Sequence, residues 1–114
     1  MAKHLGMKIL DTQEGRGGTD GSKRAMQDLL TRFPDLDAVF PINDPSALGC
    51  ISAIEAAGRA GQVTIVSVDG SRQGAAAIQA GKLDASVAQF PREIGRLAAE
   101  KAYATWPGRR WRKT

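Results

Sequence analysis

The sequence predicts an α/β fold in which helices flank a parallel sheet. Three observations support this fold class: apolar runs of strand length alternate with helix-length segments, the runs are rich in β-branched residues, and short loops join them. Such an alternation needs crossover connections, which are right-handed in almost all parallel sheets. At 114 residues, the chain has room for one small domain with a real core.

The N-terminal part, residues 1–21, is predicted to contain a frayed strand and a glycine-rich loop. Residues 7–10 form a short apolar run that is typical of a strand. Residues 15–21 are rich in glycine, which is typical of a loop. We expect this part to lie outside the main domain, because chain ends often fray.

An α/β ligand-binding lobe is predicted over residues 22–90. Its first element is a helix over about residues 22–33, where apolar residues recur at helical spacing. Asp20 or Ser22 is available as the N-cap of this helix, and Pro34 closes the segment.

A strand and a well-specified helix follow. Residues 37–42 form a continuous apolar run, which is typical of a strand covered on both faces. Pro41 restricts this strand, because proline occurs only near strand ends or at unpaired positions. Asn43 and Asp44 compete to cap the helix that opens with the next proline, and Gly58 can end that helix in a left-handed conformation.

The second half of the lobe repeats the alternation. Residues 63–68 are almost all β-branched and predict a central strand that stops at Asp69. Alanine-rich residues 75–80 predict a helix, and residues 83–89 predict a last short strand. A final helix begins at the next proline and occupies residues 91–107.

The formal net charge of +4 comes from a basic tail, residues 108–114. Four residues supply the whole excess: Arg109, Arg110, Arg112 and Lys113. A domain that grips nucleic acid spreads its Lys and Arg residues over one face, whereas this excess is confined to the chain end. We therefore interpret it as a solvated tail and expect no nucleic-acid partner.

Three polar side chains are expected at the carboxyl edge of the sheet, where ligands of parallel α/β proteins bind. Asn43, Asp69 and Gln89 each follow a predicted strand. Amide groups donate and accept hydrogen bonds, and an ionised carboxylate accepts from two hydroxyls at once, so the three residues suit a polyhydroxylated ligand. Structural roles stay open: Asn43 and Asp69 as helix caps, and Gln89 as a hinge or surface residue.

Three segments resemble the second lobe of ribose-type periplasmic sugar-binding proteins of ABC transporters. They are FPDLDAVFPINDPSALG, VTIVSVDGS and AIQAGKLDASVAQFPREIG, in the order and spacing of that family. The resemblance covers roughly residues 25–103 and implies a Rossmann-like lobe of the type I solute-binding fold, incomplete because the first lobe is absent. In that family, the residues matching Asn43, Asp69 and Gln89 bind sugar hydroxyls.

The resemblance implies the substrate-binding component of a sugar ABC transporter, with a monosaccharide or polyol as ligand and a membrane permease as partner. The family is periplasmic, but no apolar run before Met7 has the length of a signal peptide, so we expect the chain as written to stay in the cytoplasm. The alternative is the effector-sensing lobe of a sugar-responsive LacI-type transcription regulator. Such a regulator carries an N-terminal helix-turn-helix, which nothing before Met7 provides.

The sequence favours neither an enzyme nor a metal or cofactor site. The glycine-rich residues 15–21 match neither a P-loop nor the dinucleotide fingerprint. Asp44 and Asp69 could act as an acid/base pair only with a nucleophile or histidine nearby, and His4 and Cys50 are the single residues of their types. We expect Cys50 to be a small buried thiol.

The final helix is expected to pack on the lobe that is absent. Its apolar stripe comprises Ile94, Leu97, Ala98, Tyr103 and Trp106. This stripe stays exposed unless another chain or more of the sheet covers it. We therefore expect self-association through this helix, or disorder of the helix.

Overall fold

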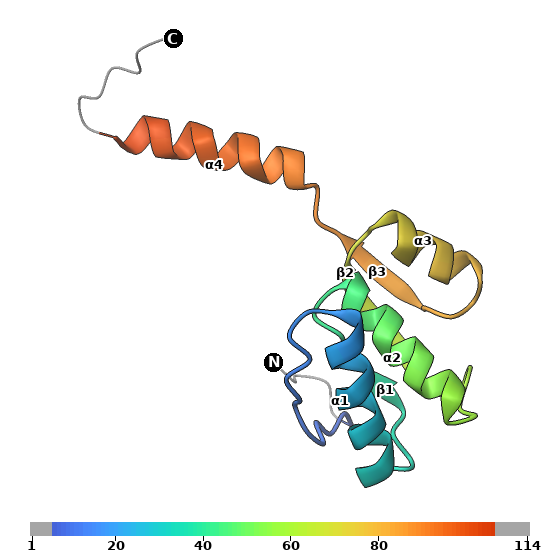
Figure 1. Ribbon diagram of the computed structural model, residues 1–114. Helices are drawn as coiled ribbons and strands as arrows, with labels where there is room; N and C mark the ends of the chain where they lie inside the picture. The colour runs from blue at the N-terminus through green and yellow to red at the C-terminus, as the bar shows by residue number, and fades with distance from the viewer. Residues whose placement is uncertain (1–5, 107–114) are drawn as a thin grey trace.

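The computed structural model describes residues 6–106 and confirms the α/β fold class. Its strands are parallel and form one sheet in the order β1-β2-β3 (Figure 1). In chain order the elements are α1 (Thr19–Arg32), β1 (Ala38–Val39), α2 (Asp44–Ala56), β2 (Thr64–Asp69), α3 (Arg72–Gln79), β3 (Ala85–Ala88) and α4 (Pro91–Thr105).

The strand β2 is central, as the sequence predicts, and pairs with β1 on one side and with β3 on the other. The chain steps in one direction across the sheet, so right-handed crossovers place α2 and α3 on the same face. Along β2, Ile65 and Ser67 are buried on this face, whereas Val66 and Val68 alternate with them and are half-buried. Helix α2 packs on β2 and α3 on β3, and α1 packs on α2.

The expectation that the first strand is covered on both faces is wrong for the part of the chain that the structure describes. The two crossover helices cover a single face, and the alternate positions of the strands point to the other one. Ala38 is exposed, and Val87 on β3 is 59% exposed. The continuous apolar run of residues 37–42 predicted helices on both faces of the sheet, and residues 6–106 supply helices on one face only.

The core lies between α1, α2 and the sheet. Its most buried apolar side chains are Met26, Ala47, Ala53, Ile54 and Ile65. Helices α1 and α2 approach closely at Gly49, where a Cβ atom would lie 2.2 Å from the carbonyl oxygen of Thr19. Next to it, Cys50 is buried, as predicted, and burial raises the pKa of its thiol to about 11, which keeps it protonated and unreactive.

The strand predicted for residues 7–10 is not formed. This segment has no regular secondary structure, and its apolar side chains, including Ile9, are exposed. A strand needs a neighbouring strand to pair its N–H and C=O groups, and none lies beside residues 7–10 in the described chain. The next residue, Asp11, instead attaches the chain to α1 through an ion pair of 2.5 Å between its Oδ2 and Arg32 Nη1.

Helix α1 begins earlier than predicted. Its N-cap is Gly18, which has no side-chain cap, and neither Asp20 nor Ser22 fills that role. The Thr19 hydroxyl donates to the carbonyl oxygen of Pro45 at 3.1 Å, at the start of α2. The first turn of α1 therefore has a hydrogen bond to the start of α2 and lacks the side-chain cap that the sequence predicted. The folded part of the chain accordingly starts before residue 22, the predicted boundary.

Other element ends agree with the local signals. Strand β1 ends at Val39, before Pro41, and Gly58 follows α2 with a φ of +70°. Helix α3 starts at Arg72, and its N-cap Ser71 accepts from the Gly74 amide at 3.0 Å. Helix α4 begins at Pro91, as predicted. The basic tail, residues 108–114, lies outside the described residues, as does His4.

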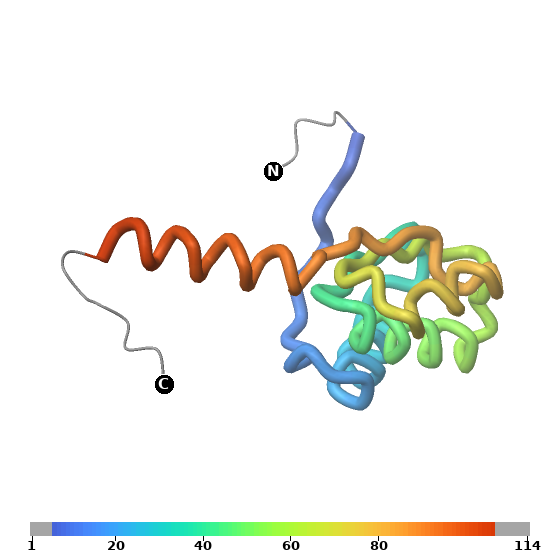
Figure 2. Tube along the Cα trace, turned by 90° about the horizontal axis from the view of Figure 1, so that it is seen from above, coloured from blue at the N-terminus to red at the C-terminus, as the bar shows by residue number. Residues whose placement is uncertain are grey.

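Helix α4 projects away from the sheet and the other helices in both views (Figures 1 and 2). None of its residues is buried. Ile94 is 52% exposed and Leu97 is 43% exposed, so the apolar stripe predicted for this helix faces solvent. Its N-cap, Phe90, has a φ of +50°. This left-handed residue marks the point where the chain leaves the sheet.

Candidate functional site

The three predicted site residues lie along one edge of the sheet. Asn43 is the N-cap of α2, Asp69 is the last residue of β2, and Gln89 directly follows β3. The structure brings two of them into contact: Gln89 Nε2 donates to Asp69 Oδ1 at 2.7 Å, and the Gln89 amide donates to the Asp69 carbonyl oxygen at 3.1 Å. Main-chain and side-chain bonds therefore hold this pair together.

Asn43 lies beside this pair, but its side chain is already engaged. Its Oδ1 accepts from the Ser46 amide at 2.9 Å, which confirms the capping role, and its Nδ2 donates to the Gly17 carbonyl oxygen at 3.0 Å. The link to Asp69 runs through the next residue, because the Asp44 amide donates to Asp69 Oδ2 at 3.3 Å. Asn43 thus joins the glycine-rich loop to the site.

Asp69 does not cap α3, because Ser71 does. Its own backbone is unusual, with a φ of +141°, and Gly70 follows with a φ of +66°. A Cβ atom on Gly70 would lie 2.8 Å from the Cα atom of Ala88, so this turn needs glycine. A residue held at positive φ costs about 1–3 kcal/mol, and such strain is often found at binding sites.

The structure places Asp44 next to the predicted site residues. The sequence indicated this residue only as a competing helix cap or as an acid/base group without a partner. Asp44 is 1% exposed, and its carboxylate accepts hydrogen bonds from three serines. Oδ1 accepts from the hydroxyls of Ser67 at 2.5 Å and Ser86 at 2.6 Å, and Oδ2 accepts from the Ser71 amide at 2.8 Å. No local pattern in the sequence brings these residues together, because they come from β2, β3 and the start of α3.

The electrostatics of Asp44 follow from these contacts. Burial raises the pKa of the carboxyl, but the hydrogen bonds from Ser67, Ser86 and Ser71 outweigh burial and lower the pKa to about 2. The side chain is therefore ionised at neutral pH inside the domain. Gly74 makes room for it, since a Cβ atom there would lie 2.2 Å from Asp44 Oδ2.

This lowered pKa predicts acid sensitivity. The pKa of Asp44 is below its ordinary value of 3.8, so its stabilising contribution is present above about pH 4 and is lost as the pH falls toward 2. A shift of this size corresponds to about 2 kcal/mol of unfolding free energy. Urea unfolding at several pH values should therefore show a loss in the wild type that the Asp44→Asn variant lacks. The Asp84→Asn variant, which keeps Asp44, should retain the loss, and parallel curves for wild type and Asp44→Asn would contradict the prediction.

The remaining hydrogen-bonding capacity of the edge suits hydroxyl groups. A carboxylate only accepts, so Gln89 must present its N–H to Asp69, and within the described chain its Oε1 and second N–H stay available. Asp69 retains further lone pairs on both carboxylate oxygens, because each oxygen accepts a single hydrogen bond from the described residues. The edge thus keeps both donor and acceptor atoms, which is what a ligand with several hydroxyls needs.

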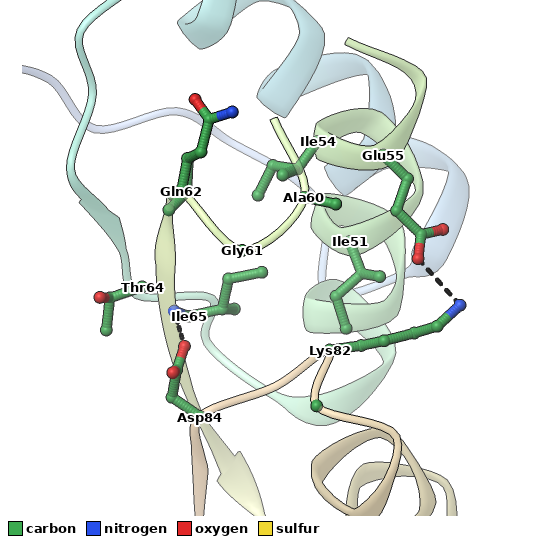
Figure 3. Close-up of a pocket in the computed structure, with 12 residues that line it drawn as sticks. Ile51, Ile54, Glu55, Ala60, Gly61, Gln62, Thr64, Ile65, Lys82 and Asp84 are labelled. Carbon is green, nitrogen blue, oxygen red and sulfur yellow. Dashed lines mark hydrogen bonds and ion pairs between the residues drawn. The ribbon is translucent and has the colours of Figure 1, made fainter. Parts of the chain in front are cut away.

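A separate pocket of about 150 Å³ lies at the other end of β2, beside Thr64 and Ile65 (Figure 3). Apolar side chains form part of its wall, and its charged groups are engaged: Lys82 pairs with Glu55 at 2.8 Å, and Asp84 accepts from the Ile65 amide at 2.7 Å. Asp69 ends the same strand about 15 Å away, since a strand rises about 3.3 Å per residue. The pocket is therefore distinct from the edge that holds Asp69 and Gln89.

Residues 6–106 show no sign of a metal site or a membrane span. No group of three or more His, Cys, Asp or Glu side chains in this range is placed to hold a metal ion. None of the helices described here has the length and apolar character needed to cross a bilayer.

Sequence comparison relates the chain to solute-binding proteins. The model of the periplasmic binding protein domain matches residues 1–109. The ribose import binding protein of Salmonella typhimurium is 47% identical over 77 residues, which are 68% of this chain and 26% of that protein. The corresponding protein of Bacillus subtilis is 40% identical over 89 residues, or 78% of this chain and 28% of that protein. The chain thus spans about a quarter of the length of these relatives.

Solved structures give the same result. An ABC transporter solute-binding protein from Actinobacillus succinogenes with bound D-allose has a TM-score of 0.77 at 29% identity, over 84% of this chain and 34% of that one. The periplasmic binding protein of the arabinose ABC transporter from Shewanella, bound to L-arabinofuranose, has a TM-score of 0.75 at 30% identity, over 90% of this chain and 36% of that one.

Proposed function

The chain belongs to the periplasmic binding protein domain family, and on that premise we propose that it forms one ligand-binding lobe of the substrate-binding component of a sugar ABC transporter. The observation that carries this proposal is the hydrogen-bonded pair of Asp69 and Gln89 at the carboxyl edge of the sheet, with Asn43 beside it. The ligand is a monosaccharide or polyol, whose hydroxyls take the hydrogen-bonding positions that these side chains leave open.

Binding by this chain alone is expected to be weak. The chain spans about a quarter of the length of these relatives, and a cleft that buries most of a ligand needs walls on both sides. A single wall provides fewer contacts, and the ligand's remaining hydroxyls stay in water. Each hydrogen bond to the Asp69 carboxylate still contributes about 1.5–3 kcal/mol. We therefore propose measurable affinity in the millimolar range, with tight binding only in a two-lobed protein.

The names of the relatives support transport over transcription regulation, because they are import binding proteins for sugars. On this proposal, the whole protein works in the periplasm and delivers its ligand to a membrane permease. On the same proposal, its site residues bind and release the sugar without chemical change.

Titration of the ¹⁵N-labelled chain with ribose, allose and arabinose tests the proposal. Saturable shift changes are expected at the amides of Asn43, Asp69, Gly70 and Gln89, with a dissociation constant of about a millimolar. Tetrahydropyran, a ring without hydroxyls, is the matched control and should leave these resonances unchanged. Changes confined to the pocket near Lys82, or no saturable change with any sugar, would contradict sugar binding at this edge. Micromolar or tighter binding would contradict the need for a second wall.

The exposed face of α4 predicts self-association. Ile94 and Leu97 lie on one side of a helix that no other described element covers, and burying them against a second copy would remove their apolar area from water. The weight-average mass in sedimentation should therefore rise with concentration, and Leu97→Glu should suppress the rise. Arg92→Gln makes the same change in charge on the opposite side of α4 and should leave the rise intact. A monomer at all concentrations would contradict this prediction.

A further inference from the structure

The buried carboxylate of Asp44 is connected to each of the three site residues. Asn43 precedes Asp44 in the chain, and the Asp44 amide donates to Asp69 Oδ2 at 3.3 Å. Asp44 Oδ1 accepts from Ser86 on β3, and Gln89 follows that strand. No other charged residue in the described chain is buried as deeply.

Ser86 carries this connection one step further. Its hydroxyl donates to Asp44 Oδ1 at 2.6 Å and accepts from the Gly70 amide at 3.0 Å. Gly70 follows Asp69 in the turn where both residues have positive φ. Asp44 is therefore linked to the Asp69 turn through its backbone amide, which donates to Asp69, and through its carboxylate, which Ser86 joins to the Gly70 amide.

From this arrangement we propose that Asp44 is a positioning residue for the sugar site: its buried carboxylate sets the spacing between the ends of β2 and β3, and thereby holds Asp69 and Gln89 within hydrogen-bonding distance. This inference rests on the proposed function for its ligand, but the geometry it explains exists without ligand. Asp44 itself is buried and does not touch the sugar.

Charge is the property that makes Asp44 suitable. An ionised carboxylate accepts from both serine hydroxyls and from the Ser71 amide at once, and it donates to none of them. Asparagine in its place has one accepting oxygen, and its NH₂ group must face either the Ser71 amide, which also donates, or the serine hydroxyls. At least one of the three bonds is then lost or reversed, with little change in side-chain volume.

The Asp44→Asn variant tests the proposal, with Asp84→Asn as the matched control. Asp84 also accepts from a main-chain amide of β2, but at the opposite end of the strand, so its loss reports on general stability. In the ligand-free chain, the side-chain NH₂ resonances of Gln89 should move toward those of a free glutamine in Asp44→Asn and stay in place in Asp84→Asn. A folded Asp44→Asn variant with unchanged Gln89 resonances would overturn the proposal.

Sugar affinity gives a second readout. Asp44→Asn should weaken binding about tenfold, which is the loss of one hydrogen bond to a charged group, whereas Asp84→Asn should leave it within about twofold. Combined with Gln89→Ala, Asp44→Asn should cost little more than Gln89→Ala alone, because both act through the same pair. Additive losses would overturn a positioning role.

Two further results keep the test decisive. If Asp44→Asn does not fold, Ser86→Ala removes one donor to the same carboxylate, and it should move the Gln89 resonances in the same direction by a smaller amount. Unchanged resonances in that variant would overturn the proposal. If the wild-type chain binds no sugar, the proposed function fails, while the Gln89 resonances still decide whether Asp44 positions the edge.

Discussion

Replacing Gly49 with alanine should destabilise the domain by about 3 kcal/mol, because the new methyl group has no space between α1 and α2. It would lie 2.2 Å from the Thr19 carbonyl oxygen and 2.9 Å from the Lys23 amide nitrogen, and both are backbone atoms that a side-chain rotation cannot move. The helices must separate, and the core that they share with the sheet opens. Urea unfolding followed by circular dichroism measures the effect.

Gly95→Ala is the matched control for this variant. It makes the same substitution inside a helix, but a Cβ atom at Gly95 meets nothing within 4 Å. Alanine favours helix by about 1 kcal/mol over glycine, so this variant should keep or raise the helix content. Equal destabilisation by both variants would show that close packing at Gly49 is not the cause.

The Asp69→Asn variant should lose sugar affinity by at least about tenfold, because hydrogen bonds to a charged group contribute about 1.5–3 kcal/mol each. Its two oxygens accept from Gln89 Nε2 and from the Asp44 amide, and an asparagine side chain must turn its NH₂ group toward one of these donors. Asparagine also tolerates positive φ better than most residues, so the backbone at this position is preserved. Titration with ribose under the conditions used for the wild type measures the loss.

Asp84→Asn again serves as the control, since it removes a carboxylate from the same sheet at the opposite end. Its ribose affinity should equal that of the wild type within about twofold. Unaltered affinity in Asp69→Asn would remove Asp69 from the site, and the sugar-binding proposal would then lose the contact on which it depends.

The family and the fold class could both be predicted from local signals. The resemblance of three segments to ribose-type sugar-binding proteins is confirmed by the family match and by the relatives. The β-branched run before Asp69 predicted the central strand. Asn43 and Asp44, the two candidate caps before Pro45, predicted the start of α2, and the structure shows that Asn43 is the cap. These features depend on residues close together in the chain, so the sequence carries them.

The gathering of polar residues at the carboxyl edge of the sheet could also be predicted from the sequence. Parallel strands all end at one side, so residues that follow them must share that side, and Asp69 and Gln89 do meet there. The sequence did not predict which bonds they make. Those bonds depend on the register between β2 and β3, in which Asp69 lies beside Ala88.

The sequence by itself determined the family, the order of helices and strands and the placement of three polar residues at one edge. Tertiary structure alone decided the state of residues 7–10, because a strand exists only with a neighbour to pair with. It also decided the start of α1, where no side chain caps the helix and the Thr19 hydroxyl donates to the Pro45 carbonyl oxygen. The sequence also could not predict the environment of Asp44. Its carboxylate stays ionised inside the domain only because serines distant in the chain donate hydrogen bonds to it.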